Sequence, residues 1–232
     1  MSIRFVYRGN EVMTGFNFDI DLAQWDHQVI EEEDRFYIGI LRPDGIRHSY
    51  HGVNCNGNVG TLLYVHGNPA GAYAGGPGTI TIADLTEQFI QARLFLDDVL
   101  RILRIRRIVY APDATMQAML SDREGRTLVI EPGIGWRLEE GRYSLMANES
   151  VLDWESTRPY RTEGDDRYQQ ADRILRSCGE TLTIPESLEL LRQVKQEGKW
   201  ATRVSFVYSV GEQAVYYVQN GQFRQIRRYA FH

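Results

Sequence analysis

The chain has 232 residues, of which 43% are hydrophobic and 25% are charged, and its formal net charge is -5. This is the composition of a globular protein with enough residues for one large core, so we expect a single domain over residues 1–232. The acidic balance argues against a nucleic-acid-binding protein, which usually carries a basic face. No apolar run reaches the ~20 residues that a membrane span needs, and no secretory leader pattern is present. Cys55 and Cys178 lie far apart in the sequence, so we expect a cytoplasmic protein with free thiols.

The first part of the chain is predicted to consist mainly of strands. Ile3, Phe5 and Tyr7 alternate with Arg4 and Val6, which predicts a strand that starts at residue 2 or 3. The segment "RGNE" then forms a turn, and "VMTGFNFDI" runs back as a second strand. Further strands are predicted in "DRFYIGILRPDG", "HSYHGVN" and "NVGTLLYVHG".

The second part alternates between helices and strands. Apolar residues at helical spacing predict two helices between Ile82 and Arg106, with a break near residues 93–97. A hairpin with a "DREGR" turn follows, and then a strand that ends at Asn148. Helices are predicted in "DDRYQQADRILRSCGE" and "IPESLELLRQVKQEG", and strands in "WATRVSFVYSV", "QAVYYVQNG" and "QFRQIRRYAF". Such separate runs of strands and helices indicate an α+β fold, in which two antiparallel sheets lie between two helical layers.

Five motifs occur in an order that resembles a known family. They are "SIRFVYRGN…TGFNFD", "HGVNCNGNVGTLLYV", "MLSDREGRTLVIE", "LMANESVLDW" and "DDRYQQADRIL". Together they resemble the choloylglycine hydrolase and penicillin V acylase family of N-terminal-nucleophile hydrolases. The resemblance implies a four-layer αββα fold. It also implies hydrolysis of a linear, non-peptide amide C–N bond in a small N-acyl molecule, with no cofactor, no metal, and possible assembly into a homo-oligomer.

The resemblance places Ser2 at the nucleophile position. Related acylases begin with Cys-Thr-Arg-Phe-Val-Tyr once Met is removed, and this chain has Ser2-Ile3-Arg4-Phe5-Val6-Tyr7 after Met1. A serine hydroxyl is a weak nucleophile until a base takes its proton. A free α-amine has a pKa of about 7.7–8.0, so the amine of an N-terminal Ser2 can be that base near pH 8. The expectation therefore requires that Met1 is removed.

The same resemblance assigns three further site residues. Asn148, within "MANES", would donate its side-chain amide to an oxyanion, and Tyr64, within "LLYV", would donate a backbone N–H. Asp19, at the end of "FNFD", would hold the N-terminal amine. Taken from the residues alone, a turn is favoured over a site role for Asn148, and a cap is favoured for Asp19.

The chain also departs from the family pattern. The family's Gly-Arg-Asn-Met-Asp is Gly-Phe-Asn-Phe-Asp here, so Phe16 replaces an arginine next to the nucleophile. A cation there would stabilise a thiolate, which a serine nucleophile does not use. A second arginine, late in the family's chain, has two candidates here, Arg203 in "WATRVSF" and Arg167 in "DDRY".

Two other hypotheses about function stay open. A relative that is catalytically inactive would bind an acylated metabolite or a protein partner, and an unrelated α+β domain would share only the architecture. His48 and His51 are three residues apart, but on a strand they would point to opposite faces, so a zinc site is not expected.

Overall fold

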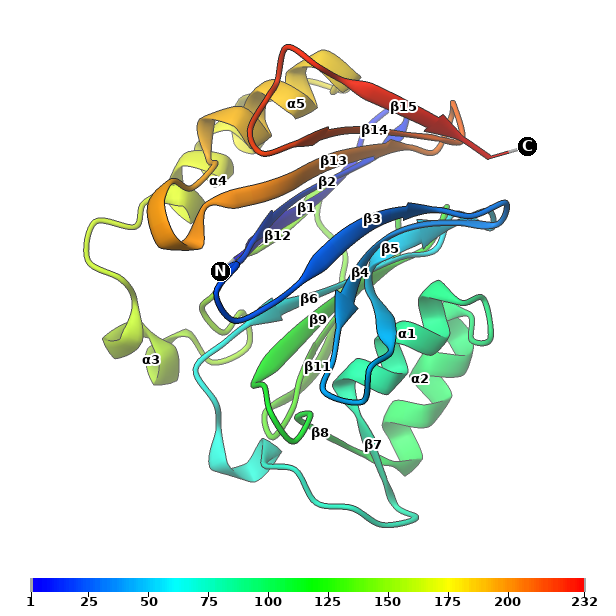
Figure 1. The fold of residues 1–232 in the computed structure, drawn as a ribbon, viewed down its shortest axis with the longest axis vertical. Helices are drawn as coiled ribbons and strands as arrows, with labels where there is room; N and C mark the ends of the chain where they lie inside the picture. The colour runs from blue at the N-terminus through cyan, green and yellow to red at the C-terminus, as the bar shows by residue number, and fades with distance from the viewer. Residues whose placement is uncertain (1, 232) are drawn as a thin grey trace.

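The computed structural model describes residues 2–231 and contains two antiparallel β-sheets stacked face to face between helices (Figure 1). The first sheet has the strand order β12 (Tyr143–Met146), β1 (Ser2–Arg8), β2 (Val12–Asp19), β13 (Thr202–Ser209), β14 (Ala214–Gln219) and β15 (Arg227–Ala230). The second has the order β11 (Gly135–Glu139), β10 (Thr127–Glu131), β9 (Met116–Ser121), β6 (Val59–Tyr64), β5 (Arg47–Asn54), β4 (Arg35–Leu41) and β3 (His27–Glu31).

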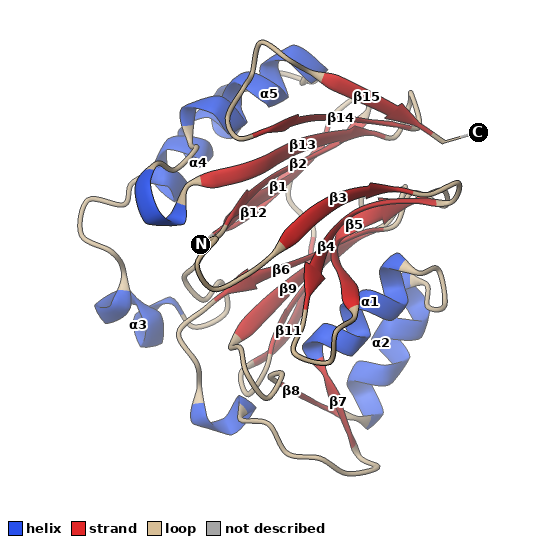
Figure 2. Ribbon diagram, viewed as in Figure 1, coloured by secondary structure: helices blue, strands red, loops and turns tan. Residues whose placement is uncertain are grey.

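Helices cover the outer face of each sheet (Figure 2). The first sheet is covered by α4 (Arg167–Ser177) and α5 (Ile184–Gln193), and the second by α1 (Ile82–Ile90) and α2 (Leu96–Ile105). The connections contain the short helix α3 (Trp154–Thr157) and a parallel strand pair, β7 (Thr79–Thr81) and β8 (Arg107–Val109). No helix within residues 2–231 is both long enough and apolar enough to cross a membrane.

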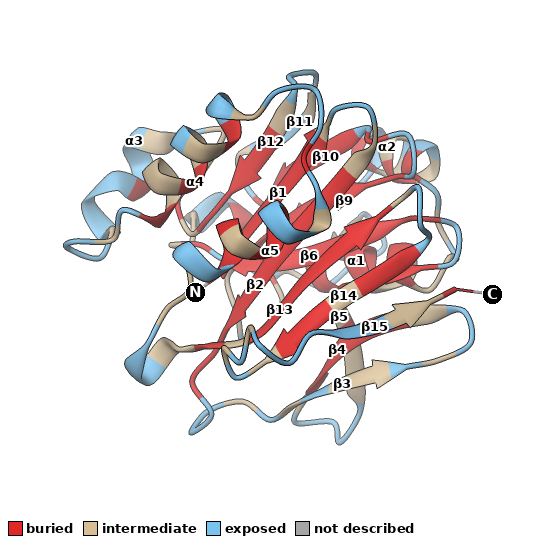
Figure 3. Cartoon of the chain, turned by 90° about the horizontal axis from the view of Figure 1, so that it is seen from above, coloured by how far each residue is buried: buried red, intermediate tan, exposed pale blue. Residues whose placement is uncertain are grey.

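The alternation along β1 explains how the layers pack. Ile3, Phe5 and Tyr7 point outward and pack with residues of α4 and α5, whereas Val6 points inward to the core between the sheets. Successive side chains of a strand point to opposite faces, so Ser2 and Arg4 share the inward face with Val6. Figure 3 shows that the central strands of both sheets are buried along most of their length. The nucleophile candidate thus lies at one end of the cleft between two packed sheets.

Arg4 crosses the space between the sheets, and no carboxylate of residues 2–231 pairs with it. Its Nη1 donates hydrogen bonds to the carbonyl oxygens of Val59 (3.2 Å) and Met119 and to Thr61 Oγ1 (3.1 Å), and its Nη2 donates to Ser121 Oγ (2.5 Å). Complete burial lowers the pKa of Arg4 to about 9. This side chain therefore ties β1 to β6 and β9, and its positive charge lies on the same face of β1 as Ser2.

The predicted order of elements is confirmed, including the break between α1 and α2. Four strands, β3, β7, β8 and β11, were missed. The five-residue strand β3 lies at a sheet edge and is only partly buried, so its apolar alternation is weak. The pair β7 and β8 joins segments about thirty residues apart in parallel, and three-residue strands leave no local pattern to detect.

Candidate active site

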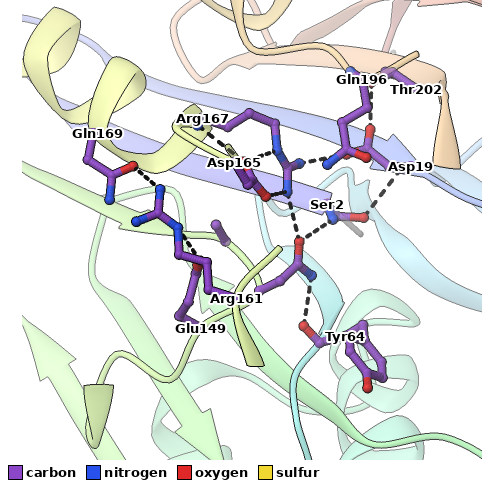
Figure 4. Close-up of polar contacts among 12 residues, drawn as sticks. Ser2, Asp19, Tyr64, Glu149, Arg161, Asp165, Arg167, Gln169, Gln196 and Thr202 are labelled. Carbon is purple, nitrogen blue, oxygen red and sulfur yellow. Dashed lines mark hydrogen bonds and ion pairs between the residues drawn. The ribbon is translucent and has the colours of Figure 1, made fainter. Parts of the chain in front are cut away.

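Ser2 lies at the start of β1 and contacts two of the predicted site residues. In β1 it is paired with Phe18 of β2, which places Asp19 next to it. The backbone N–H of Ser2 donates to Asn148 Oδ1 (3.0 Å), and Ser2 Oγ accepts a hydrogen bond from the backbone N–H of Asp19 (3.3 Å). Met1, whose removal the assignment of Ser2 as nucleophile requires, lies outside the described residues. The nitrogen and the hydroxyl oxygen of Ser2 are thus each fixed by a different strand or loop (Figure 4).

Asp19 is a buried carboxylate held by two side chains. Its Oδ1 accepts from Thr202 Oγ1 (2.6 Å) on β13, and its Oδ2 accepts from Arg167 Nη1 (2.8 Å) at the start of α4. Burial raises the pKa of Asp19 to about 7, although Arg167 and the Thr202 hydroxyl act in the opposite direction. The carboxyl group therefore changes its charge near neutral pH.

Arg167 joins three of the site's polar groups. Besides Asp19, it donates to Asp165 through Nε (2.9 Å to Oδ1) and Nη2 (2.7 Å to Oδ2), and to Asn148 Oδ1 through Nη2 (3.2 Å). Burial disfavours the guanidinium charge, but the hydrogen bonds and negative charges of Asp165 and Asp19 outweigh it and raise the pKa of Arg167. A permanent cation therefore lies beside Asp19 and Asn148 (Figure 4).

Asn148 lies in the loop after β12 and has an amide that contacts three groups. Its Oδ1 accepts from Ser2 and Arg167, and its Nδ2 donates to the carbonyl oxygen of Tyr64 (2.8 Å). An amide nitrogen carries two hydrogens, so one N–H of Nδ2 is left for another acceptor next to Ser2. Tyr64 contacts Asn148 through its carbonyl oxygen. The expected role of the Tyr64 backbone N–H as a donor to the oxyanion stays a prediction.

Gln117, a fully buried residue of β9, holds the loop on both sides of Asn148. Its Nε2 donates to the carbonyl oxygens of Ala147 (2.9 Å) and Glu149 (3.0 Å). The two bonds fix the backbone before and after Asn148, and they therefore fix the direction of its side chain. We infer that Gln117 is a positioning residue for Asn148.

Replacing Gln117 by methionine is expected to loosen the Asn148 loop. Two buried carbonyls lose their donor, which costs about 1–3 kcal/mol of unfolding free energy. A displaced Asn148 should lower kcat by roughly tenfold to a hundredfold with little change in KM. The measurements are urea denaturation and steady-state kinetics. Gln193→Met is the matched control, because the exposed Gln193 bonds only to Glu189 on its own helix, and this variant should match the wild type in both assays. Unchanged kcat in Gln117→Met would refute the positioning role.

The site opens into a cavity of about 980 Å³. Ser2, Asp19 and Tyr64 lie on its wall, together with several aromatic side chains of the loops and strands. These aromatic residues are Trp25, Tyr50, Tyr73, Tyr110 and Trp200. Arg42 on the wall is paired with Asp113 and stacks over the ring of Trp25 (4.6 Å), so its charge is compensated. A cavity with such walls suits an apolar or aromatic group of a small molecule.

Five of the six predicted site residues meet in space. Ser2, Asp19, Tyr64, Asn148 and Arg167 form one connected set of contacts.

Arg203, the other arginine candidate, does not join this set. It lies at the irregularity in β13 between Thr202 and Val204, and among residues 2–231 no hydrogen bond or ion pair links its guanidinium to the site. Its charge instead adds to burial in lowering the pKa of His27. The register of β13 against β2 shifts at this point, and Thr202, the neighbour of Arg203, is the residue that bonds to Asp19.

Four residues of the site were missed from sequence: Gln117, Asp165, Thr202 and His51. Asp165 and Thr202 each lie within two positions of a named arginine candidate, so those motifs contained a usable signal. Gln117 and His51 had no such signal in the sequence, because they join the site only through contacts between distant segments.

The described part of the chain contains no group of three His, Cys, Asp or Glu side chains that could hold a metal ion. His48 contacts Asp44 and Glu87 on the outer side of its sheet, whereas His51 packs on Phe16 between the sheets. The two histidines therefore point to opposite faces, as the strand alternation predicts.

Comparison with known proteins identifies the fold. No protein-family model and no curated protein sequence matches the chain. A mutant of the conjugated bile acid hydrolase from Clostridium perfringens matches with a TM-score of 0.69 and 14% identity, over 99% of this chain and 92% of that one. Penicillin V acylase from Agrobacterium tumefaciens matches with a TM-score of 0.66 and 17% identity, over 94% of this chain and 83% of that one. At these identities the likeness establishes the fold, so the expected α+β fold of N-terminal-nucleophile hydrolases is confirmed.

Proposed function

We propose that this chain, which has the fold of the bile acid hydrolase and penicillin V acylase, is a hydrolase that cleaves a linear amide bond of a small N-acyl molecule. The observation that supports this best is the arrangement at the start of β1. The nitrogen and the hydroxyl of Ser2 lie together at the wall of a large cavity, next to a buried Asp19–Arg167 pair and an amide donor. One residue can then supply both nucleophile and base.

The proposed reaction starts with attack of Ser2 Oγ on the carbonyl carbon of the substrate amide. The neutral α-amine of Ser2, free once residue 1 is removed, takes the hydroxyl proton directly or through water. The second N–H of Asn148 Nδ2 donates to the oxyanion that forms. Collapse of this intermediate breaks the C–N bond, and the amine group returns the proton to the leaving nitrogen. Water then attacks the acyl ester on Ser2 by the same proton path and releases the acid.

Asp19 and Arg167 keep the reacting groups in place. The carboxylate of Asp19 attracts the α-amine of Ser2 when this amine is charged. The backbone N–H of Asp19 donates to the hydroxyl oxygen of Ser2 and fixes its position. Arg167 and the Ser2 nitrogen share Asn148 Oδ1, which leaves Nδ2 directed to the carbonyl oxygen of Tyr64 on the cavity wall. Arg4, on the same face of β1, adds positive charge at longer range. This arrangement compensates in part for the arginine that Phe16 replaces.

Intact-mass spectrometry tests the proposal directly. Protein purified from the native host should be one methionine lighter than the translated chain. Incubation with an activated acyl ester should then add one acyl group, and peptide mapping should place it on Ser2. A protein that retains Met1 has no α-amine at Ser2, and this result would exclude the proposed mechanism.

We expect kcat/KM to fall steeply as the pH falls below about 7. Asp19 has a raised pKa of about 7, so its carboxylate is present only above that pH and its ion pair with Arg167 is lost below it. The α-amine, with an ordinary pKa of about 7.7–8.0, must also be neutral. Two protonations should give log(kcat/KM) a slope approaching 2 below pH 7. A rate that is flat from pH 5 to pH 8 would contradict the assignment of both groups.

The same shift predicts the opposite trend for stability. Because the pKa of Asp19 is higher in the folded chain than its ordinary value of 3.8, the folded state holds this proton more tightly. The contribution of Asp19 to the free energy of unfolding therefore falls as the pH rises from about 4 to about 7. Denaturation curves of the wild type and Asp19→Asn across this range measure it, because asparagine does not titrate.

A second candidate function is binding of an acylated metabolite without turnover. The observation that favours it is Phe16, which is fully buried beside Phe206 and leaves no cation at that position of β2. Calorimetry with intact N-acyl amides separates the two candidates. Tight binding with neither an acyl-enzyme nor product would support the binding function.

A further inference from the structure

His51 is a buried polar residue on the wall of the same cavity as Ser2. It lies on β5 and points toward the first sheet, with its ring stacked on Phe16 (centroids 5.3 Å apart) and tilted against Phe18 (4.9 Å). Phe18 is the cross-strand partner of Ser2. Only 4% of the surface of His51 is exposed, and that part lines the cavity. The imidazole therefore lies on the wall of the cavity that Ser2 also lines, and packs against the cross-strand partner of Ser2.

Hydrogen bonding fixes the proton of this ring on Nε2. The backbone N–H of Leu62 donates to His51 Nδ1 (3.2 Å), so Nδ1 carries no hydrogen. Burial lowers the pKa of His51 to about 3, which keeps the ring neutral, so the one remaining proton is on Nε2. Within residues 2–231 the hydrogen bond of this ring is the one from Leu62, and Nε2 donates to no residue. Because His51 lines the cavity and Nε2 is not fully buried, the acceptor for this N–H is water or a molecule bound in the cavity.

The chemistry of the ring excludes two other roles. A base for Ser2 must have a free nitrogen that faces it, but the only unprotonated nitrogen of His51 is already used by Leu62. A metal ligand needs companions, and the described residues contain no group of His, Cys, Asp or Glu around it. The remaining role is that of a neutral hydrogen-bond donor to a bound molecule.

We propose that His51 Nε2–H selects acyl groups that carry an acceptor oxygen, such as an ether or keto oxygen, one or two bonds beyond the scissile carbonyl. This inference rests on the proposed hydrolase function. Phe18 packs against His51, the backbone N–H of Leu62 bonds to it, and Ile40 lines the same cavity. An oxygen facing His51 gains a hydrogen bond that a methylene group cannot make. A methylene in that position displaces water from the N–H and offers no acceptor in its place.

A matched pair of substrates tests the inference. The p-nitroanilides of butoxyacetic acid and heptanoic acid differ only by an oxygen in place of one methylene group. The wild type should have a kcat/KM at least about tenfold higher for the butoxyacetyl compound. His51→Phe should reduce the preference to about one. His51→Gln should restore part of it, because the glutamine amide can place a donor near the position of Nε2.

Controls keep the outcome interpretable. His48→Gln changes the other histidine of β5, which bonds to Asp44 and Glu87 outside the cavity, and should keep the wild-type preference. Hydrolysis of both compounds at equal kcat/KM by the wild type would overturn the role of His51 and leave the hydrolase function standing. Absence of hydrolysis would count against the hydrolase function. Calorimetry with the two intact amides then tests the inference. Equal affinities of the wild type for the two compounds would overturn it. Tighter binding of the ether compound by the wild type, and loss of this preference in His51→Phe, would support it.

Discussion

Ser2→Ala is expected to abolish turnover while leaving the fold intact. The substitution removes the attacking oxygen, and loss of a nucleophile lowers kcat by at least about a thousandfold in enzymes that form acyl intermediates. Ser2 Oγ accepts only one hydrogen bond from the described residues, the 3.3 Å contact from the Asp19 N–H, so the free energy of unfolding should change by less than about 1 kcal/mol. Steady-state kinetics and urea denaturation measure the two quantities. Substantial activity in Ser2→Ala would rule out Ser2 as the nucleophile.

Ser2→Cys is the companion variant. It keeps the α-amine and the position of the nucleophile but introduces a thiol, which is intrinsically more reactive. Because Phe16 supplies no cation to favour the thiolate, we expect activity near or below that of the wild type. Adding Phe16→Arg should not restore a family-like site, because Phe16 is completely buried between Phe206 and His51 and a second charge beside Arg4 would be uncompensated.

Arg167→Met is expected to cause the largest loss of stability at the site. Arg167 is the cation between Asp19 and Asp165, and its removal takes the compensating charge from the buried Asp19 and the partly buried Asp165, while the Thr202 hydroxyl still donates to Asp19. Breaking a buried ion pair from one side costs about 3–5 kcal/mol. The pKa of Asp19 should rise further, because the charge that opposes the effect of burial is gone. Enzyme activity should fall together with stability, because Asn148 loses the donor that helps to orient its amide.

Arg203→Met is the matched control for this variant. Arg203 is the other arginine of the two sequence candidates, and its guanidinium has no described bond to the site, so its replacement should cost less than about 1 kcal/mol and preserve activity. The double variant Arg167→Met with Asp19→Asn should be more stable than the two single losses predict, because both charges of one pair are removed together. Equal losses in the two arginine variants would contradict the assignment of Arg167 to the site.

The sequence by itself determined the order of the elements and most of the candidate site. The signals that predicted these elements are local: alternation of apolar residues along β1 and β2, helical spacing in α1 and α2, and turn residues between strands. Such signals can be detected without knowing which segments pack against each other. The positions of Ser2, Asp19, Tyr64 and Asn148 followed from ordered motifs. The structure brings these four residues together from strands and loops that lie up to 146 positions apart, as in the Ser2–Asn148 bond.

Only the tertiary structure decided which groups complete the site. Arg167 and Arg203 looked alike in sequence, and the contacts of Arg167 at the start of α4 with Asp19 and Asn148 distinguish it from Arg203. In the sequence, His51 is one polar residue on a predicted strand. In the structure, Phe16 and Phe18 of the facing sheet pack against its ring, and the backbone N–H of Leu62 donates to its Nδ1. Burial and hydrogen-bond partners set the charge and the donor atoms of such groups. Both depend on contacts between distant segments, so no local pattern contains them.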